Sequence, residues 1–324
     1  MKETPPPPTR VDRGTARTFI IGTRSSHLAL WQAHRVQALL PASSQLHYIT
    51  TSGDRFRDIP LQGGSQTGFF TKEIEDLLTR GTIDIAVHSL KDLPTRQAPG
   101  LAVAACLERA PVDDLLLVSP EWHEPGNLLP VRAGCVIGAG SLRRQALVRL
   151  YAPAAVPTLI RGNVPTRVEK CRGGQYGAVL LARAGLERLG LDLSGLVVYR
   201  MLTHAWIPAP GQGAVAVEVR ADDAEAVAVV SAIDHPATTE AVTLERELLA
   251  RFEGGCHTAF GAHAVKSGDG WTVAVGMDRG EAGWGQTLYS GSRARCADHS
   301  PADLPGFAAV AVSRQEDLCV PYRP

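Results

Sequence analysis

The first candidate for chemistry is the cysteine of the segment "EGGCHTAFG", residues 253 to 261, where Cys256 follows two glycines at the end of an expected helix. Glycines allow positive φ angles and close backbone approach, which suits a thiol that is presented in a loop. A helix C-cap followed by a buried cysteine explains the same nine residues without any chemistry. Cys256 therefore becomes a functional candidate only if other segments supply partners for it.

A pair of arginines in "GAGSLRRQ", residues 138 to 145, is the second candidate. Ser141 is a good N-cap, so Arg143 and Arg144 fall in the first turn of a helix, where cations oppose the helix dipole at roughly 0.3–1 kcal/mol each when exposed. Such a turn can form an anion site from free backbone N–H groups and two guanidinium groups. The alternative is two solvated arginines on the surface.

Two further strand-to-helix turns carry arginine. In "LIRGNVPTR" a strand ends in Arg161, Asn163 can cap the next helix, and Arg167 lies in its first turn; "GTRSSHLAL" places Arg24 between a strand and a serine-capped helix. In open α/β sheets, ligands bind at the carboxyl ends of the strands. We therefore expect a ligand rich in negative charge at this edge.

The segment "HSLKDLP", residues 88 to 94, also follows a strand, but it supplies a lysine and a carboxylate. Lys91 and Asp92 could form a surface pair worth less than about 1 kcal/mol. Alternatively, Asp92 is a buried acid whose charge faces a cationic intermediate. The pattern alone leaves both interpretations open.

Bulk composition limits the class of protein. The chain has 324 residues, of which 44% are hydrophobic and 20% charged, so we expect a globular protein of two or three domains. The 33 basic and 33 acidic residues balance, which argues against a general nucleic-acid binder. Only five of the basic residues are lysines, so 28 are arginines, the side chain that matches carboxylate geometry.

The N-terminal segment contains four consecutive prolines and no apolar core, so we expect a disordered leader over residues 1–17 rather than a signal peptide or anchor. This favours a cytoplasmic protein without a membrane segment, whose six cysteines are thiols. Their spacing contains no Cys-x-x-Cys pair, so we expect no structural metal site.

The candidate functional residues named above lie on alternating predicted strands and helices. Residues 18–110 predict a mainly parallel sheet, with a helix over 25–40 that carries Leu28, Trp31, Val36 and Leu39 on one face. The pattern repeats in kind from residue 113, and 211–220 add one more strand. A helix over about 237–253 and short antiparallel strands then predict a separate α+β unit.

Seven segments together resemble the porphobilinogen deaminase (hydroxymethylbilane synthase) family in order and spacing. They are "TRSSHLALWQAHRV", "DIAVHSLKDLP", "GSLRRQ", "RGNVPTR", "LARAGLERLG", "PGQGAVAVE" and "EGGC", between residues 19 and about 260. The resemblance implies a transferase of tetrapyrrole and heme biosynthesis. It would condense four porphobilinogen units head to tail, with loss of ammonia, on a dipyrromethane cofactor joined to Cys256 by a thioether, and release hydroxymethylbilane by hydrolysis.

The resemblance also assigns roles to residues. Asp92 would be the general acid and base that stabilises developing positive charge. The cofactor's acid groups would bind a first set of side chains: Ser89, Lys91, Asp92, Ser141, Arg143 and Arg144. The incoming substrate would bind a second set: Arg24, Ser26, Phe70, Arg161, Arg167 and Arg188. No metal is implied, and Gly211 to Gly213 would allow close backbone approach at the domain junction.

The implied fold has two α/β domains like those of periplasmic binding proteins, joined by a hinge, and a smaller C-terminal α+β domain that carries the cysteine. We expect domain 1 over 18–112 and 211–231, domain 2 over 113–210 and domain 3 over 232–324. The family also implies a monomer that binds neither nucleic acid nor membrane and hands its product to the next pathway enzyme.

The chain departs from the family pattern at three places. Ala139 and Gly140 replace a hydroxyl pair before "SLRR", the segment "LQGGSQTGFFTKE" lacks a lysine, and His257 follows the cysteine. We interpret His257 as a packing variant rather than a base.

Two other function classes remain to be compared. A binding module of two hinged lobes that close on an anion would need neither Cys256 nor Asp92, and a secreted receptor would need a signal peptide. A cysteine hydrolase would need a histidine partner, which sequence cannot place in space.

Overall fold

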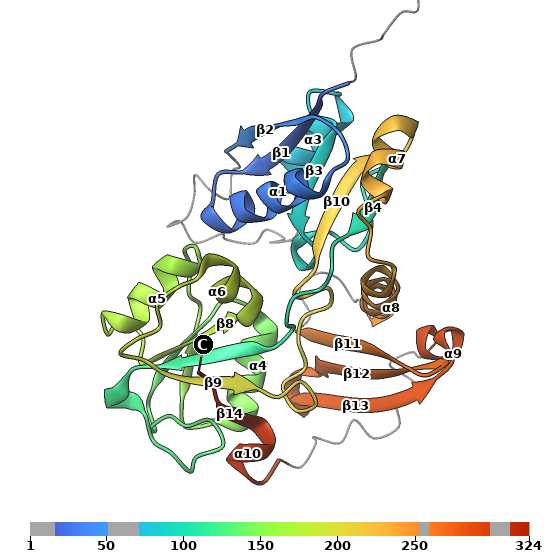
Figure 1. Ribbon diagram of the computed structural model, residues 1–324. Helices are drawn as coiled ribbons and strands as arrows, with labels where there is room; N and C mark the ends of the chain where they lie inside the picture. The colour runs from blue at the N-terminus through green and yellow to red at the C-terminus, as the bar shows by residue number, and fades with distance from the viewer. Residues whose placement is uncertain (1–16, 51–70, 253–258, 299–311, 324) are drawn as a thin grey trace, which may run out of the picture.

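The computed structural model of the protein describes residues 17–50, 71–252, 259–298 and 312–323. They form two α/β units and a third unit built on a small antiparallel sheet, at the top, lower left and lower right of Figure 1. In this part of the chain, no helix combines the length and the apolar composition that crossing a bilayer requires. The expected leader lies almost entirely outside the described residues.

The first unit contains a five-stranded sheet with helices on both faces. In spatial order its strands are β2 (Ser44–Ile49), β1 (Phe19–Arg24), β3 (Ile85–Ser89), β10 (Val215–Arg220) and β4 (Leu101–Cys106). The first three are parallel, and β10 runs antiparallel to both of its neighbours. One face packs against α1 (His27–Leu39) and α7 (Ala224–Ser231), and the other against α3 (Lys72–Thr79).

The second unit contains a six-stranded sheet. In spatial order its strands are β14 (Cys319–Pro321), β9 (Val197–Met201), β5 (Asp114–Val118), β8 (Ala178–Ala182), β6 (Val136–Ala139) and β7 (Val156–Thr158). The helices α4 (Leu142–Tyr151), α5 (Val164–Arg172) and α6 (Arg183–Leu189) cover it. Strand β5 is buried throughout: Leu116 and Val118 face a core with α4, and Leu115 and Leu117 face a core with α5 and α6.

Apart from β14, the two sheets have the same plan. In each, three parallel strands are followed by a strand that runs antiparallel to both of its neighbours, β10 in the first sheet and β5 in the second. The chain reaches both of these strands by crossing between units, along 107–113 and 202–214. The prediction of two similar α/β units is thus confirmed, but their sheets are mixed rather than mainly parallel, because β10 and β5 each run antiparallel to both neighbours.

The third unit confirms the predicted α+β character of the C-terminal region. Its antiparallel strands are β11 (Phe260–Ser267), β12 (Gly270–Asp278) and β13 (Trp284–Gly291). The long helix α8 (Pro236–Phe252) and the short α9 (Arg293–Ala297) pack against this sheet through a shared apolar core. Helix α8 ends immediately before residues 253–258, which lie outside the described part of the chain.

The end of the chain departs from the expected boundary of the third unit. Helix α10 (Gln315–Leu318) leads into β14, which pairs with β9 in the second sheet. Leu318 and Cys319 are buried in the core of that unit. The final strand therefore belongs to the second unit. A strand of only three residues carries too little pattern for its long-range pairing with β9 to be predicted from the sequence.

A single buried carboxylate fastens both crossing segments to the third unit. Glu245, on α8, accepts two hydrogen bonds from Arg109 at 2.8 Å each, and further bonds from the backbone N–H groups of Gly211 and Ala264 at 2.7 and 2.9 Å. Arg109 belongs to the first crossing and Gly211 to the second. The two crossings are therefore held together where the units meet.

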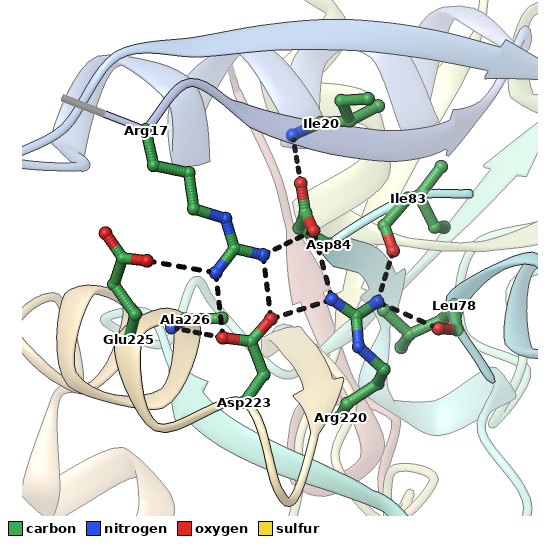
Figure 2. A network of polar contacts seen from close by, with 9 residues as sticks. All are labelled: Arg17, Ile20, Leu78, Ile83, Asp84, Arg220, Asp223, Glu225 and Ala226. Atoms are coloured by element: carbon green, nitrogen blue, oxygen red, sulfur yellow. Dashed lines mark hydrogen bonds and ion pairs between the residues drawn. The ribbon is translucent and has the colours of Figure 1, made fainter. Parts of the chain in front are cut away.

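At the far end of the first sheet, five charged side chains form what we call the N-terminal clasp: Arg17, Asp84, Arg220, Asp223 and Glu225 (Figure 2). Arg17 contacts all three carboxylates at 2.6 to 3.1 Å, and Arg220 contacts Asp84 and Asp223 at 3.0 and 2.7 Å. Asp223 also caps α7. The clasp thus joins the start of β1 to the end of β10.

Candidate functional site

A pocket of about 80 Å³ lies between the two α/β units, at the carboxyl ends of β3 and β8. Five residues that the sequence singled out line it together: Ser89, Lys91, Arg144, Arg167 and Arg188. They come from the end of β3, the turn after it, and the helices α4, α5 and α6. The structure therefore brings four of the predicted charged side chains together at this edge of the sheets, with Ser89 beside them.

The first turn of α4 is built as the sequence predicted, but its arginines are buried. Ser141 caps the helix by accepting a hydrogen bond from the backbone N–H of Arg144. Arg143 and Arg144 are only 4% and 6% exposed, so the alternative of two solvated surface arginines is wrong. Both guanidinium groups donate to Asp114, at 2.6 to 3.0 Å.

Asp114, the first residue of β5, is the main feature that sequence reasoning missed. Its carboxylate also accepts hydrogen bonds from Trp206 Nε1 and Gln212 Nε2, both at 2.9 Å. Burial alone would raise the pKa of Asp114, but the guanidinium groups of Arg144 and Arg143 outweigh burial and hold this pKa far below its usual range. An aspartate that opens the wholly apolar run "LLLV" was the one available indication.

Lys91 lies in the short 3-10 turn η1 (Leu90–Asp92) that follows β3. Its ammonium group is 3.4 Å from Gln212 Oε1. The pKa of Lys91 is lowered to about 8, first because surrounding protein atoms desolvate the ammonium; Asp92 and Asp114 oppose this shift, whereas Arg144 and Arg143 add to it. The low pKa therefore reflects first the protein atoms around the ammonium, although the residue as a whole is exposed, and only then the repulsion from Arg144 and Arg143.

Asp92 ends the same turn, and its side chain is exposed rather than buried. Its negative charge raises the pKa of both Lys91 and Arg167 relative to the effect of burial alone. The carboxylate is therefore within electrostatic reach of cations on both sides of the pocket. An accessible acid in this position can interact with a bound molecule.

Arg167, in the first turn of α5, donates from Nε to the carbonyl oxygen of Gly162 at 2.8 Å. Burial lowers its pKa to about 10, and Arg144 and Arg161 contribute to the shift. A Cβ atom on Gly140 would lie 2.6 Å from Arg167 Nη1. The glycine at this departure from the family pattern therefore makes room for the guanidinium.

Arg188, on α6, reaches from the second unit to the first. It donates to the carbonyl oxygen of Gly213 at 2.7 Å, and its guanidinium lies 5.2 Å from the ring centre of Trp31. Burial lowers its pKa to about 10. Gly213 itself has a φ of 86°, and a Cβ there would lie 2.4 Å from the carbonyl oxygen of Ala110. The predicted close backbone approach at the domain junction is confirmed at this glycine.

The other predicted site residues have local structural contacts or lie at the ends of helices and strands. Ser89 is hydrogen-bonded to Gln32, at 2.9 Å from Nε2, and Ser26 caps α1 by accepting from the backbone N–H of Ala29. Arg24 ends β1, and Arg161 precedes α5. The other predicted residues, Phe70, Cys256 and His257, lie outside the described residues, as do residues 61–68 at the start of the segment "LQGGSQTGFFTKE".

We define the cationic cluster as Lys91, Arg143, Arg144, Arg167 and Arg188. Near it, two carboxylates, Asp92 and Asp114, carry negative charge. Within the described part of the chain, the Nε atoms of Arg143 and Arg188 are buried without a hydrogen-bond partner. Buried donors without partners are costly, so this cluster is suited to a ligand with several carboxylates.

Comparison with known proteins supports the same chemistry. Residues 19–228 match the family model described as "Porphobilinogen deaminase, dipyromethane cofactor binding domain". A porphobilinogen deaminase of Roseiflexus sp. (strain RS-1) is 42% identical over 258 residues, which cover 78% of this chain and 83% of the relative. One from Nostoc sp. (strain PCC 7120) is 41% identical over 268 residues, covering 81% of each chain.

Among solved structures, the similar chains include sensor and solute-binding domains. The VFT2 domain of Bordetella pertussis BvgS, as a double mutant, aligns with a TM-score of 0.42 and 11% identity, over 67% of this chain and 86% of that chain. A periplasmic binding protein of Salmonella typhimurium, described as highly specific for arginine, aligns with a TM-score of 0.40 and 10% identity, over 69% and 94%.

Proposed function

The chain belongs to the porphobilinogen deaminase family, and on that premise we propose which of its side chains carry the family's reaction. The reaction joins four porphobilinogen units head to tail, with loss of ammonia from each, and forms hydroxymethylbilane for tetrapyrrole biosynthesis. When bound, the dipyrromethane cofactor supplies the primer to which the units are joined. Its attachment point, we propose, is the Cys256 thiol.

The observation that carries this assignment is the excess of positive charge in the cationic cluster. Each porphobilinogen unit has an acetate and a propionate, and a growing chain of units therefore accumulates carboxylates. Guanidinium groups bind carboxylates through paired, charge-assisted hydrogen bonds. Arg143, Arg144 and Lys91, with Ser89 and Ser141, would bind the acid groups of the cofactor.

The incoming substrate would bind beside these residues, on the side of the pocket that α5 and α6 form. Arg167 and Arg188 line the pocket and would hold its carboxylates, and Arg161 lies close enough to lower the pKa of Arg167. Arg24 and Ser26 stand at the junction of β1 and α1, at the same edge of the first sheet. Phe70 would stack on a pyrrole ring.

Asp92 is the proposed acid–base group. Loss of ammonia from porphobilinogen leaves a cationic pyrrole, and a fixed carboxylate stabilises that developing charge. The carboxylate of Asp92 is exposed and directly follows Lys91, which lines the pocket, so it would exchange a proton with a substrate bound there.

Domain boundaries at the two crossings, action as a cytoplasmic monomer, and transfer of the product to the next enzyme of the pathway complete the proposal. Both crossings pass beside Glu245, and this shared position is where a hinge between the units would lie. The cytoplasmic location, the monomeric state and the transfer of the product rest on the family alone.

Two variants test the assignment. The wild-type protein should be heavier than its sequence mass by two porphobilinogen-derived units, and Cys256→Ala should lack this added mass in intact-mass spectrometry. Asp92→Asn should retain the added mass and lose at least about 100-fold in turnover. An unmodified wild-type protein with full activity would exclude Cys256, and normal turnover in Asp92→Asn would exclude that carboxylate.

A further inference from the structure

Gln212 lies where the two α/β units and both crossings meet, between Lys91 and Asp114. It is 1% exposed, and its backbone is fixed on both sides: its N–H donates to the carbonyl oxygen of Ala209 at 3.0 Å, and its carbonyl oxygen accepts from Arg109 Nε at 2.9 Å. Its side chain therefore has little freedom to choose other partners.

The orientation of the Gln212 amide is determined by its neighbours. Nε2 lies 2.6 Å from the carbonyl oxygen of Val112 and 2.9 Å from Asp114 Oδ1, and both of these atoms can only accept. Oε1 must therefore point the other way, where Lys91 Nζ lies 3.4 Å away. One neutral side chain thus connects an ammonium of the first unit to the carboxylate that holds both arginines of the second.

We propose that Gln212 is a positioning residue, which joins Lys91 to the Asp114–Arg143–Arg144 group so that the cationic cluster is assembled across the two units. This inference rests on the proposed function of that cluster in binding carboxylates. The Gln212 Oε1 acceptor keeps the Lys91 ammonium directed into the pocket. The hydrogen bond from Gln212 Nε2 to Asp114 prevents that carboxylate from drawing Lys91 out of the pocket.

The charged groups that face Lys91 determine what a change at Gln212 should do. They are Asp92 on its own turn, Asp114 on β5, and Arg143 and Arg144 on α4. Loss of the Gln212 acceptor removes a favourable interaction of the protonated form, so the pKa of Lys91 falls. A carboxylate at position 212 adds negative charge beside the ammonium, so the pKa of Lys91 rises by about one pH unit or more.

Lysine NMR can follow this group directly, because the chain has only five lysines. The holoenzyme is labelled at the lysine side chains, and the Lys91 resonance is assigned by its loss in Lys91→Met. The titration midpoint should move down in Gln212→Met and up in Gln212→Glu, and the alkaline limb of kcat/KM for porphobilinogen should move in the same directions. Because the two variants should shift the Lys91 midpoint in opposite directions, either one tests the proposal if the other folds poorly.

Gln286→Met is the matched control, because Gln286 is also buried and bonded, to His204 and Trp284, but lies in the third unit. It should leave both the Lys91 midpoint and the kinetics unchanged. An unchanged Lys91 midpoint in both Gln212 variants overturns the proposal, and so does a moved midpoint with unchanged kinetics. A wild-type protein without turnover would contradict the proposed function instead, and the lysine titration would still report on Gln212.

Discussion

The N-terminal clasp and the cationic cluster are both rich in arginine, yet their electrostatics are opposite. In the clasp, two guanidinium groups meet three carboxylates, and the hydrogen bonds that Arg17 donates to Asp223 and Asp84 raise the pKa of Arg17 above its usual value. In the cluster, desolvation by the surrounding protein atoms lowers the pKa of Lys91 to about 8 and those of Arg167 and Arg188 to about 10. The same residue type is neutralised in one region and left in excess in the other.

The difference teaches how to separate structural from functional arginines in this chain. A guanidinium in a group that has at least as many protein carboxylates as cations stabilises the fold, as Arg220 does. Arg143 and Arg144 share the single carboxylate of Asp114, so their group keeps a net positive charge. A half-buried guanidinium with backbone carbonyl partners, such as that of Arg167 or Arg188, keeps its charge available to a ligand. Variants in the two regions should therefore separate activity from stability.

The largest effect is expected in the cationic cluster. Arg167→Gln should lower kcat/KM for porphobilinogen about 100-fold, equivalent to about 2.7 kcal/mol, because a charge-assisted contact to a substrate carboxylate is lost. Its free energy of unfolding should stay near that of the wild type, since no protein carboxylate loses its partner. Steady-state kinetics and urea unfolding measure the two quantities; unchanged kcat/KM would remove Arg167 from the site.

The clasp should show the reverse. Arg220→Gln should lower the free energy of unfolding by about 2 kcal/mol, because Arg220 holds Asp84, Asp223 and the carbonyl oxygens of Leu78 and Ile83. Turnover measured well below the melting temperature should stay within about twofold of wild type, since the clasp is at the opposite end of the sheet. A loss of activity without a loss of stability would break the comparison.

The pH dependence sharpens the comparison on the alkaline side. The pKa of Lys91 is about 8 without the cofactor and should be higher in the holoenzyme, so the ammonium is lost as the pH rises above 8, and KM should then rise, approaching roughly tenfold per pH unit. Lys91→Arg stays charged and should show a flatter KM profile between pH 7 and 9. Identical profiles for the two proteins would mean that Lys91 does not bind carboxylates.

The smallest effect is expected on the acid side, in the clasp. Hydrogen bonds from Arg17 hold the pKa of Asp223 well below its usual range, and the pKa of Asp84 is also lowered. Depressed carboxyl pKa values contribute stability above about pH 4, and this contribution is lost as the pH falls through the folded-state values. Asp223→Asn should therefore be less stable than wild type by about 1 kcal/mol at pH 7, with a smaller difference at pH 3. A difference that grows on acidification would contradict this account.

Local features of the fold could be predicted from the sequence. The serine caps at Ser26 and Ser141, the strand at Ile85–Ser89 and the helix at Pro236–Phe252 follow from side-chain types over a few residues, and all are present. Which side chains of α1 are buried was less predictable. Trp31 and Leu39 are 38% and 39% exposed, whereas Gln32 is buried because it bonds Ser89.

The candidate site could be predicted only in part, because its partners come from distant segments. The arginines of "SLRR" were recognisable, but their carboxylate, Asp114, is about 30 residues away, and Gln212 is 98 residues from Asp114. The sequence therefore predicted an anion site and missed the buried group that organises it. Long-range contacts of this kind depend on the pairing of the sheets rather than on local pattern.

The central claim is that carboxylates of the bound cofactor and substrate balance the positive charge of the cationic cluster. The most direct measurement is the NMR titration midpoint of Lys91 in the wild-type holoenzyme and in Cys256→Ala, with intact mass to establish loading. We predict a midpoint near 8 in the variant that lacks the cofactor and a higher value in the holoenzyme, because cofactor carboxylates stabilise the ammonium. Equal midpoints in a fully loaded wild type and an unloaded variant would contradict the account.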